Sequence, residues 1–342
     1  MKDILAEIQT WEEQNQRFAM ATVVDTWRAA PRMIGSTMLI SEDLDIVGSV
    51  SGGCVEGSVI KQAKETLASG EAKLLMFGVS NEDAWSVGLS CGGKIKVFVE
   101  PFVGQKPDEN SKIIWQRAKD NLTRDEPFVL ISQINGNANK FLLDPHFLPL
   151  DKRMRELSDA AENALKRRES ELIAIDQMPY FLQVFPAKNH LIIIGAAHLS
   201  VDLVLLAQQL DFRTTVIDPR GIFTESLRKL CHPGDLIKAW PHDVLTKMDL
   251  DENVYAVTLT HDPKIDDQAL HLLLASDVKY IGALGSKKTH AKRVSRLEKA
   301  GFSPEQIDRI NGPIGLNIGA RTAREIALSI VGQLVESRRA TA

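Results

Sequence analysis

The spacing of hydrophobic residues changes along the chain, and the change predicts differently built parts. Over residues 1–103, short apolar runs typical of strands surround a predicted helix at 54–69. The apolar positions of that helix lie on one stripe, and Gly70 stands where a helix stop is expected. This pattern predicts a small N-terminal α/β domain in which helix covers one face of a single sheet.

The apolar pattern is weakest between residues 104 and 187. Polar stretches there accompany two predicted helices and two predicted short strands, the helices at 110–122 and 151–168 and the strands at 128–134 and 140–143. We interpret this segment as a connecting region that extends the N-terminal sheet.

Predicted strands alternate with predicted helices throughout residues 188–342. The strands are apolar runs at 190–195, 214–218, 235–240, 255–260 and 280–284. Such alternation predicts a Rossmann-like, doubly wound parallel sheet, so the chain as a whole is assigned to the α/β class.

The first strand of this C-terminal domain is followed by a turn similar to a dinucleotide-binding loop. Gly195 closes the strand, a helix follows, and Asp218 ends the next strand about 20 residues later, where an acid would meet a ribose hydroxyl. However, Ala197 and Ser200 stand at the second and third glycine positions, and a β-carbon at Ala197 would hold a diphosphate away. The turn predicts the Rossmann fold. It leaves open either NAD(P) binding or a scaffold kept for its shape or for another ligand.

Two histidines and an aspartate follow neighbouring strands of the predicted sheet. His198 comes after the first strand, and His261 and Asp262 come after the fourth. Because ligands of such sheets bind at the carboxyl ends of strands where the strand order reverses, we expect these side chains to lie close together. They could orient a substrate, transfer a proton or bind a metal. Alternatively, His198 lies inside a first helical turn, and His261 and Asp262 only cap the next helix.

Two loops of the N-terminal domain each place a cysteine beside two glycines. The three cysteines of the chain are too few for a disulfide framework. A thiol near a helix N-terminus is a better thiolate, and thiolates bind thiophilic metals, so we predict that the two cysteines are metal ligands and that the glycines contact a cofactor. The alternative is that each thiol is a small buried hydrophobe, the role we assign to Cys231. The residues of the two loops are Gly52, Gly53 and Cys54, and Cys91, Gly92 and Gly93.

Charge and composition exclude several classes of partner. The net charge is −4, and no basic patch is present to hold a polyanion, which argues against nucleic acid. The N-terminal segment MKDILAEIQTWEEQNQRF carries acids and amides where a secretory signal needs apolar residues. No apolar run approaches the roughly 20 residues that span a bilayer. These features predict a cytoplasmic protein without membrane contact.

A series of motifs in this chain resembles the xanthine dehydrogenase accessory proteins of the XdhC/CoxI type. The series runs almost end to end, as APRMIGSTMLI, GSVSGGCVEG, GLSCGG, HLIIIGAAH, VIDPR, LTHDP, YIGALGSKK and GPIGLNIGARTAREIALSI. The resemblance implies a protein that binds the molybdenum cofactor (molybdopterin) as cargo and assists its sulfuration. It also implies insertion of that cofactor into a xanthine dehydrogenase-type molybdenum hydroxylase, without turnover chemistry of its own.

The resemblance also implies roles for individual residues. By position in GGCVEG and SCGG, Cys54 and Cys91 are the thiols that would meet molybdenum or the transferred sulfur, and Glu56 joins the candidate cofactor-binding residues. The family typically has GAGH where this chain has Gly195 to His198, so the sequence departs from the family at Ala197.

Three classes of function are therefore compared. The first is a non-enzymatic cofactor chaperone that serves a molybdenum hydroxylase, with a cysteine desulfurase as a further candidate partner and with homodimer formation left open. The second is an NAD(P)-dependent oxidoreductase that uses His198 or His261 as acid or base. The third is an adaptor that binds only proteins. We favour the chaperone because the two cysteine loops and the motif series both point to it.

Overall fold

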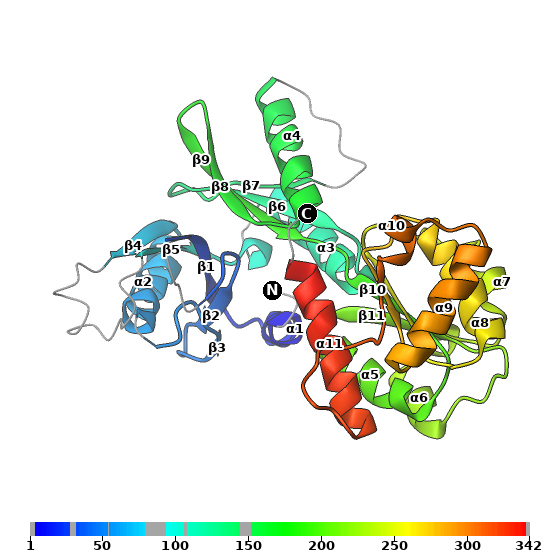
Figure 1. Ribbon diagram of the computed structural model, residues 1–342. Coiled ribbons are helices and arrows are strands. Elements are labelled where there is room, and N and C mark those ends of the chain that lie inside the picture. The colour runs from blue at the N-terminus through cyan, green and yellow to red at the C-terminus, as the bar shows by residue number, and fades with distance from the viewer. Residues whose placement is uncertain are drawn as a thin grey trace. The chain divides into compact units, whose positions relative to one another are not determined.

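The computed structural model describes residues 4–27, 32–53, 55–78, 94–105, 108–143 and 152–339 (Figure 1). The chain divides into two compact units, Met1–Ala187 and Lys188–Ala342, which are described separately below. Among the described helices, none is long and apolar enough to cross a membrane.

The first sheet of the N-terminal unit has five antiparallel strands in the order β3-β2-β1-β5-β4. Alternate residues of the central strand β1 enter two different cores, because successive side chains of a strand point to opposite faces. The strands are β1 (Phe18–Trp27), β2 (Thr37–Ser41), β3 (Ile46–Gly48), β4 (Lys73–Gly78) and β5 (Lys94–Pro101).

Helices cover both faces of this sheet, so the prediction that only one face is covered was wrong. On one face, the predicted helix packs through Val59, Ala63 and Leu67. On the other face, two further helices bury Trp11 and Trp115 against the phenylalanines of the sheet. The three helices are α2 (Glu56–Ser69) on the first face, and α1 (Leu5–Glu13) and α3 (Glu109–Arg124) on the second.

The segment between 104 and 187 contains a sheet of its own. Four antiparallel strands have the order β7-β6-β9-β8, and the helix that precedes β8 packs on them through Leu157, Ala161 and Ala164. The prediction that this segment extends the first sheet is therefore corrected, since its strands pair only with one another among the described residues. The elements are β6 (Phe128–Gln133), β7 (Lys140–Leu143), α4 (Lys152–Arg167), β8 (Glu171–Ile175) and β9 (Met178–Phe185).

The C-terminal unit is a Rossmann-like doubly wound domain, as predicted. Its six strands are all parallel and have the order β12-β11-β10-β13-β14-β15. The strand order reverses between β10 and β13, which makes the carboxyl ends of these two strands the expected ligand crevice. The strands are β10 (Asn189–Ile194), β11 (Phe212–Ile217), β12 (Leu236–Ile237), β13 (Val254–Thr258), β14 (Tyr280–Ala283) and β15 (Ile310–Asn311).

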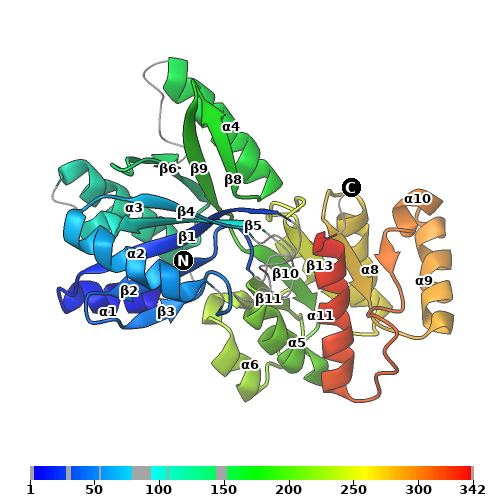
Figure 2. The same cartoon turned by 90° about the vertical axis from the view of Figure 1, so that its left-hand side faces the viewer.

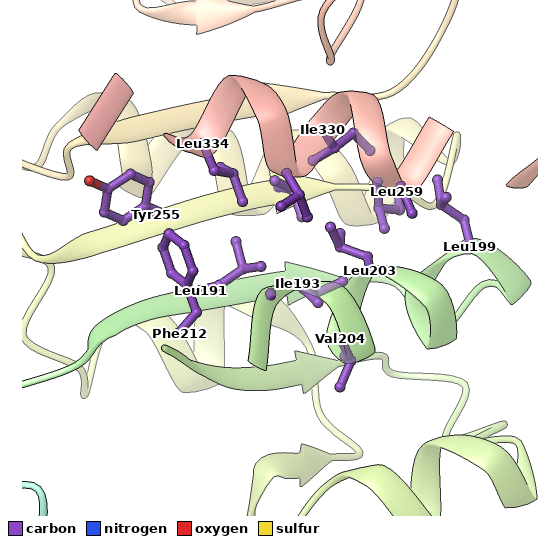
Figure 3. Close-up of a cluster of buried hydrophobic side chains, with 14 of the residues drawn as sticks. Leu191, Ile193, Leu199, Leu203, Val204, Phe212, Tyr255, Leu259, Ile330 and Leu334 are labelled. Carbon is purple, nitrogen blue, oxygen red and sulfur yellow. The ribbon is translucent and has the colours of Figure 1, made fainter. Parts of the chain in front are cut away.

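Helices on both faces of this parallel sheet bury its apolar strands (Figure 2). Figure 3 shows Ile330 and Leu334 of α11 packed over β13, with Leu203 of α5 on the same face. The opposite face is covered by α8 and α9. The helices of this unit are α5 (His198–Gln209), α6 (Glu225–Leu230), α7 (Pro241–Leu245), α8 (Pro263–Leu274), α9 (Lys287–Lys299), α10 (Pro304–Ile307) and α11 (Ala323–Arg339).

Candidate functional site

The glycine turn that precedes α2 is organised around the carboxylate of Glu56. This carboxylate accepts hydrogen bonds from the backbone N–H groups of Ser51, Gly52 and Gly53, at 3.0, 2.9 and 2.8 Å. The hydroxyls of Ser49 and Ser51 also donate to it, the former at 3.0 Å. The amides of the glycines that the sequence predicted to contact a cofactor thus donate to a side chain of the protein itself.

Electrostatics keep Glu56 charged in this position. Burial alone would raise its pKa, but the hydrogen bonds from Ser51 and Ser49 outweigh burial and lower the pKa to about 2. The backbone of Gly52 and Gly53 has φ of 79° and 129°, a region that only glycine adopts readily. A β-carbon at either position would have no atom within 4 Å, so glycine is favoured here by the backbone conformation and not by close packing.

The two predicted thiol ligands, Cys54 and Cys91, lie outside the described residues. Helix α2 begins at Glu56, two residues later than predicted. Gly92 and Gly93 also lie outside the described residues. The proposed contacts of these two cysteines and two glycines with a metal or cofactor remain predictions.

The turns that follow β10 and β13 lie against each other, as the sequence predicted. Gly195 has φ of 112°, and a β-carbon there would lie 2.7 Å from Cγ2 of Thr260 and 3.2 Å from its backbone nitrogen. Glycine is therefore required by close contact between the turns. Helix α5 begins directly after the first turn at His198, and Ala197 at its N-cap provides no side-chain hydrogen bond.

Asp218 ties the first of these turns to the end of β11. Its side chain is 2% exposed and accepts a hydrogen bond from the backbone N–H of Ala196 at 2.8 Å. The backbone and guanidinium of Arg220 also donate to it, at 2.7 to 3.0 Å. Burial would raise its pKa, but these hydrogen bonds lower it. A ribose hydroxyl would have to displace protein donors, so this arrangement does not favour the NAD(P) interpretation.

The second turn presents His261 and is held by a buried acid. His261 is exposed and has φ of 61°, the left-handed region that residues with side chains rarely adopt. Asp262 is the N-cap of α8 and accepts a hydrogen bond from the backbone N–H of Lys264 at 2.9 Å, so Asp262 caps the helix as one interpretation proposed. The hydroxyl of Thr260 lies 2.6 Å from Oδ1 of Asp266, which is 2% exposed.

Metal binding receives no support from the described side chains. Within those parts of the chain, no group of three or more His, Cys, Asp or Glu residues is placed to hold a metal ion. His198 is exposed at the first residue of α5, as the structural interpretation of this histidine also proposed. Cys231 is buried in the core beneath α5 and α6, and burial raises the pKa of its thiol, which fits the structural role assigned to it.

Two cavities elsewhere contain none of the predicted site residues. One, of about 570 Å³, lies in the N-terminal unit and is lined by residues that include Arg17, Asn139 and Lys140. The other, of about 420 Å³, lies beside β12 and is lined by residues that include Phe223 and Arg228. Neither cavity coincides with the glycine turn of Glu56 or with the paired turns of the C-terminal unit.

Two family models match the chain, one in each unit. The model described as the XdhC and CoxI family matches residues 11–78, and the model described as the XdhC Rossmann domain matches residues 191–334. The chain belongs to the XdhC and CoxI family. The sequence resemblance is thereby confirmed, and it extends to the Rossmann unit.

Relatives of this XdhC-family chain align with it over nearly its full length. A probable xanthine dehydrogenase subunit of Bacillus subtilis is 28% identical over 337 residues, which are 96% of each chain. The molybdenum cofactor insertion chaperone PaoD of Escherichia coli is 23% identical over 326 residues, 93% of this chain and 83% of PaoD. A crystal structure of a xanthine dehydrogenase from Bacillus halodurans is 26% identical, covers 99% of this chain and 96% of its own, and superposes with a TM-score of 0.72.

Sequence reasoning missed Asp266 and Arg293 of the XdhC Rossmann unit. Both are 2% exposed, and Arg293 donates from Nη2 to the carbonyl of Leu284 at 2.9 Å. Asp266 directly follows the buried Ile265 in a helix whose other buried residues are apolar. An acid among the inward-facing positions of a helix is a signal that could have identified it, because buried carboxylates are rare unless they are paired.

Proposed function

We propose that this XdhC-family chain binds the molybdenum cofactor and assists its insertion into a xanthine dehydrogenase-type molybdenum hydroxylase. The observation that carries the proposal is the match to the insertion chaperone PaoD over 93% of the chain, because it includes both units. The match to the probable xanthine dehydrogenase subunit of Bacillus subtilis supports the class of client. Sulfuration of the cofactor is a further part of the proposal.

The N-terminal unit supplies the proposed metal contacts. Cys54 follows directly on the turn that Glu56 holds, so the backbone before this thiol is fixed by several hydrogen bonds. Thiolates suit a thiophilic metal centre such as molybdenum, and Cys91 with Gly92 and Gly93 provides the second proposed contact. Glu56 follows Cys54 by two residues in the sequence, and a negative charge close to a thiol opposes thiolate formation. We therefore propose that the metal, more than the helix N-terminus, stabilises the deprotonated Cys54.

The C-terminal unit supplies the proposed contacts to the organic part of the cargo. Its paired turns meet at the reversal of strand order, where ligands of open α/β sheets bind. His198 and His261 are exposed there, and the first turn of α5 has no side-chain cap. We propose that Gly195, His198, His261 and Asp262 lie along the pterin or its phosphate.

The experiment is expression in an anaerobic host that makes the cofactor, followed by measurement of molybdenum and pterin per purified chain. The wild-type chain is expected to carry both. Cys54→Ser and Cys91→Ser are expected to lose molybdenum first, because each removes a soft ligand. Cys231→Ser is the matched control, since it also removes a thiol but lies in a packed core.

Activation of a separately prepared, cofactor-free hydroxylase tests the delivery step. The loaded wild-type chain is expected to restore hydroxylase activity, and the two cysteine variants are expected to restore less. A wild-type chain without molybdenum or pterin would refute the proposed function. Equal loading of all three cysteine variants and the wild type would refute only the thiol assignment.

A further inference from the structure

Each turn of the Rossmann crevice carries an exposed histidine and is tied from behind by a buried carboxylate. In the first turn, Asp218 is 1% exposed and bonds the backbone N–H of Ala196, two residues before His198. In the second turn, Asp266 is 2% exposed and bonds the hydroxyl of Thr260, the residue before His261. Buried carboxylates cost desolvation free energy, so two that each bond a turn of the crevice call for an explanation beyond packing.

The backbone of His261 is held in an unfavourable conformation. Its φ of 61° is of the left-handed type, which is unfavourable for a residue with a β-carbon. The hydroxyl of Thr260 fixes this turn twice, since it contacts Oδ1 of Asp266 and accepts from the backbone N–H of Asp262 at 3.0 Å. Glycine at this position would remove the strain, so the presence of an exposed imidazole needs a reason outside folding.

Buried polar side chains also lie near the carboxyl end of β14, the strand next to β13. Arg293 is 2% exposed, its Nη2 donates to the carbonyl of Leu284 at the end of β14, and its Nε has no partner among the described residues. The hydroxyl of Thr258 at the end of β13 also lacks a partner within that part of the chain. The charges of Asp266 and Arg293 attract each other. Buried polar side chains thus lie near these strand ends beside apolar neighbours such as Ile265, whereas the buried residues further along α8 are all apolar.

We propose that His198 and His261 contact the cargo directly, and that Asp218 and Asp266 are positioning residues for these two histidines. This inference rests on the proposed function and assigns residues within it. Imidazole N–H groups and the uncapped first turn of α5 are hydrogen-bond donors, so the group they receive is an oxygen-rich anion. In the proposed cargo, the phosphate is such a group.

Substitution of His261 by glycine separates a binding role from a folding role. His261→Gly relieves the left-handed strain, so the thermal unfolding midpoint is expected to stay unchanged or to rise. Loss of a hydrogen bond to a charged group is expected to weaken cargo binding about tenfold. Lower cargo occupancy at equal or higher stability supports the inference. Wild-type occupancy in both His261→Gly and His198→Ala would overturn it.

Substitutions of Thr260 test the positioning role. Thr260→Val removes the hydroxyl that links the turn to Asp266 and keeps the side-chain shape, whereas Thr260→Ser retains the hydroxyl. The valine variant is expected to lose cargo and to shift the imidazole NMR signal of His261, and the serine variant is expected to restore both. Asp267→Asn is the control, because it breaks the neighbouring ion pair with Arg296, at 2.6 Å, and keeps the hydroxyl of Thr260 that contacts Asp266.

This experiment distinguishes failure of the proposed function from failure of the positioning role. If the wild-type chain carries no molybdenum or pterin, the proposed function falls and the inference falls with it. If the wild-type chain carries cargo and Thr260→Val moves neither cargo nor the His261 signal beyond the effect of Asp267→Asn, only the positioning role is overturned.

Discussion

Replacing Glu56 by glutamine should destabilise the N-terminal unit, because five donors converge on this carboxylate. A pKa lowered from 4.5 to about 2 corresponds to at most about 3.5 kcal/mol at roughly 1.4 kcal/mol per tenfold change. The side chain is only partly buried, so solvent screening reduces this figure. We expect Glu56→Gln to lower the free energy of unfolding by about 1 to 2 kcal/mol at pH 7.

The effect of Glu56→Gln should depend on pH with a defined sign. The folded chain holds the carboxylate with a pKa of about 2, and the unfolded chain has the ordinary value of 4.5. Unfolding therefore takes up a proton between these values, and the stabilisation is complete above pH 4.5 and is lost as the pH falls towards 2. The stability difference between wild type and variant should be constant from pH 6 to 8 and should shrink below pH 4.5.

Denaturant unfolding monitored by tryptophan fluorescence measures this difference, because Trp11 and Trp115 lie in the core of the N-terminal unit. Hydrogen exchange should also become faster at the backbone amides of residues 51–53, which lose their acceptor. Glu65→Gln is the matched control, an exposed acid on the same helix. Equal unfolding midpoints at pH 7, or a difference unchanged at pH 3, would refute the reasoning.

Two further predictions concern buried charges away from the candidate site. The ammonium of Lys140 lies 2.8 Å from Glu100, and their side chains are 1% and 2% exposed. Lys140→Met should lower the free energy of unfolding by about 3 to 5 kcal/mol, because it leaves the buried carboxylate of Glu100 without a counter-charge. Adding Glu100→Gln to this variant should restore most of the lost stability, as measured by denaturant unfolding. Burial and the nearby Arg213 lower the pKa of His190 from 6.5 to about 4, so the C-terminal unit should lose up to about 3 kcal/mol as the pH falls from 6.5 to 4. His190→Gln should abolish that loss in unfolding monitored by Trp240 fluorescence; an unchanged pH dependence would contradict it.

The Rossmann unit could be predicted closely because its strands are buried on both faces. Four of the five predicted strands lie within two residues of their observed bounds, since continuous apolar runs between helices have few other interpretations. The predicted strand at 235–240 is only Leu236–Ile237, and β15 (Ile310–Asn311) was not predicted. Both edge strands have only two residues, which is too short for a periodic signal.

The hairpin of β8 and β9 was missed because its turn lacks the usual residues. Asp176 and Gln177 both have positive φ, of 50° and 64°, as a two-residue hairpin turn of this hand requires. Asn-Gly or Asp-Gly is the common sequence signal for such a turn, and glutamine at the second position hides it. Likewise, α1 directly precedes β1 and α3 closely follows β5, but local periodicity indicates only that a helix forms and not which face of a sheet it covers.

For the candidate site, the sequence could predict which turns form the site but not which groups of the protein already bond to those turns. It predicted that the turns after β10 and β13 meet, and the contact of Gly195 with Thr260 confirms this. It also assigned Asp218 to a ribose hydroxyl and the glycines at 52 and 53 to a bound cofactor. Whether a donor or acceptor is already satisfied depends on side-chain direction, which a motif does not encode. Only the structure therefore showed that Asp218 is already bonded to Arg220 and that the amide of Gly52 is already bonded to Glu56.

In both units a side-chain carboxylate of the protein accepts hydrogen bonds from the backbone amides of a candidate turn, which restricts how this chain can recognise a ligand. An anion that approached the amides of Gly52 and Gly53 would have to displace a carboxylate, and hydrogen bonds to a charged group are worth about 1.5 to 3 kcal/mol each. The amide of Ala196 is likewise held by Asp218. Recognition through these backbone amides would therefore start with a large energetic deficit. The exposed side chain of His261 is free of that cost, so we expect substitution of His261 to change cargo binding more than substitutions that only alter the backbone of the turns.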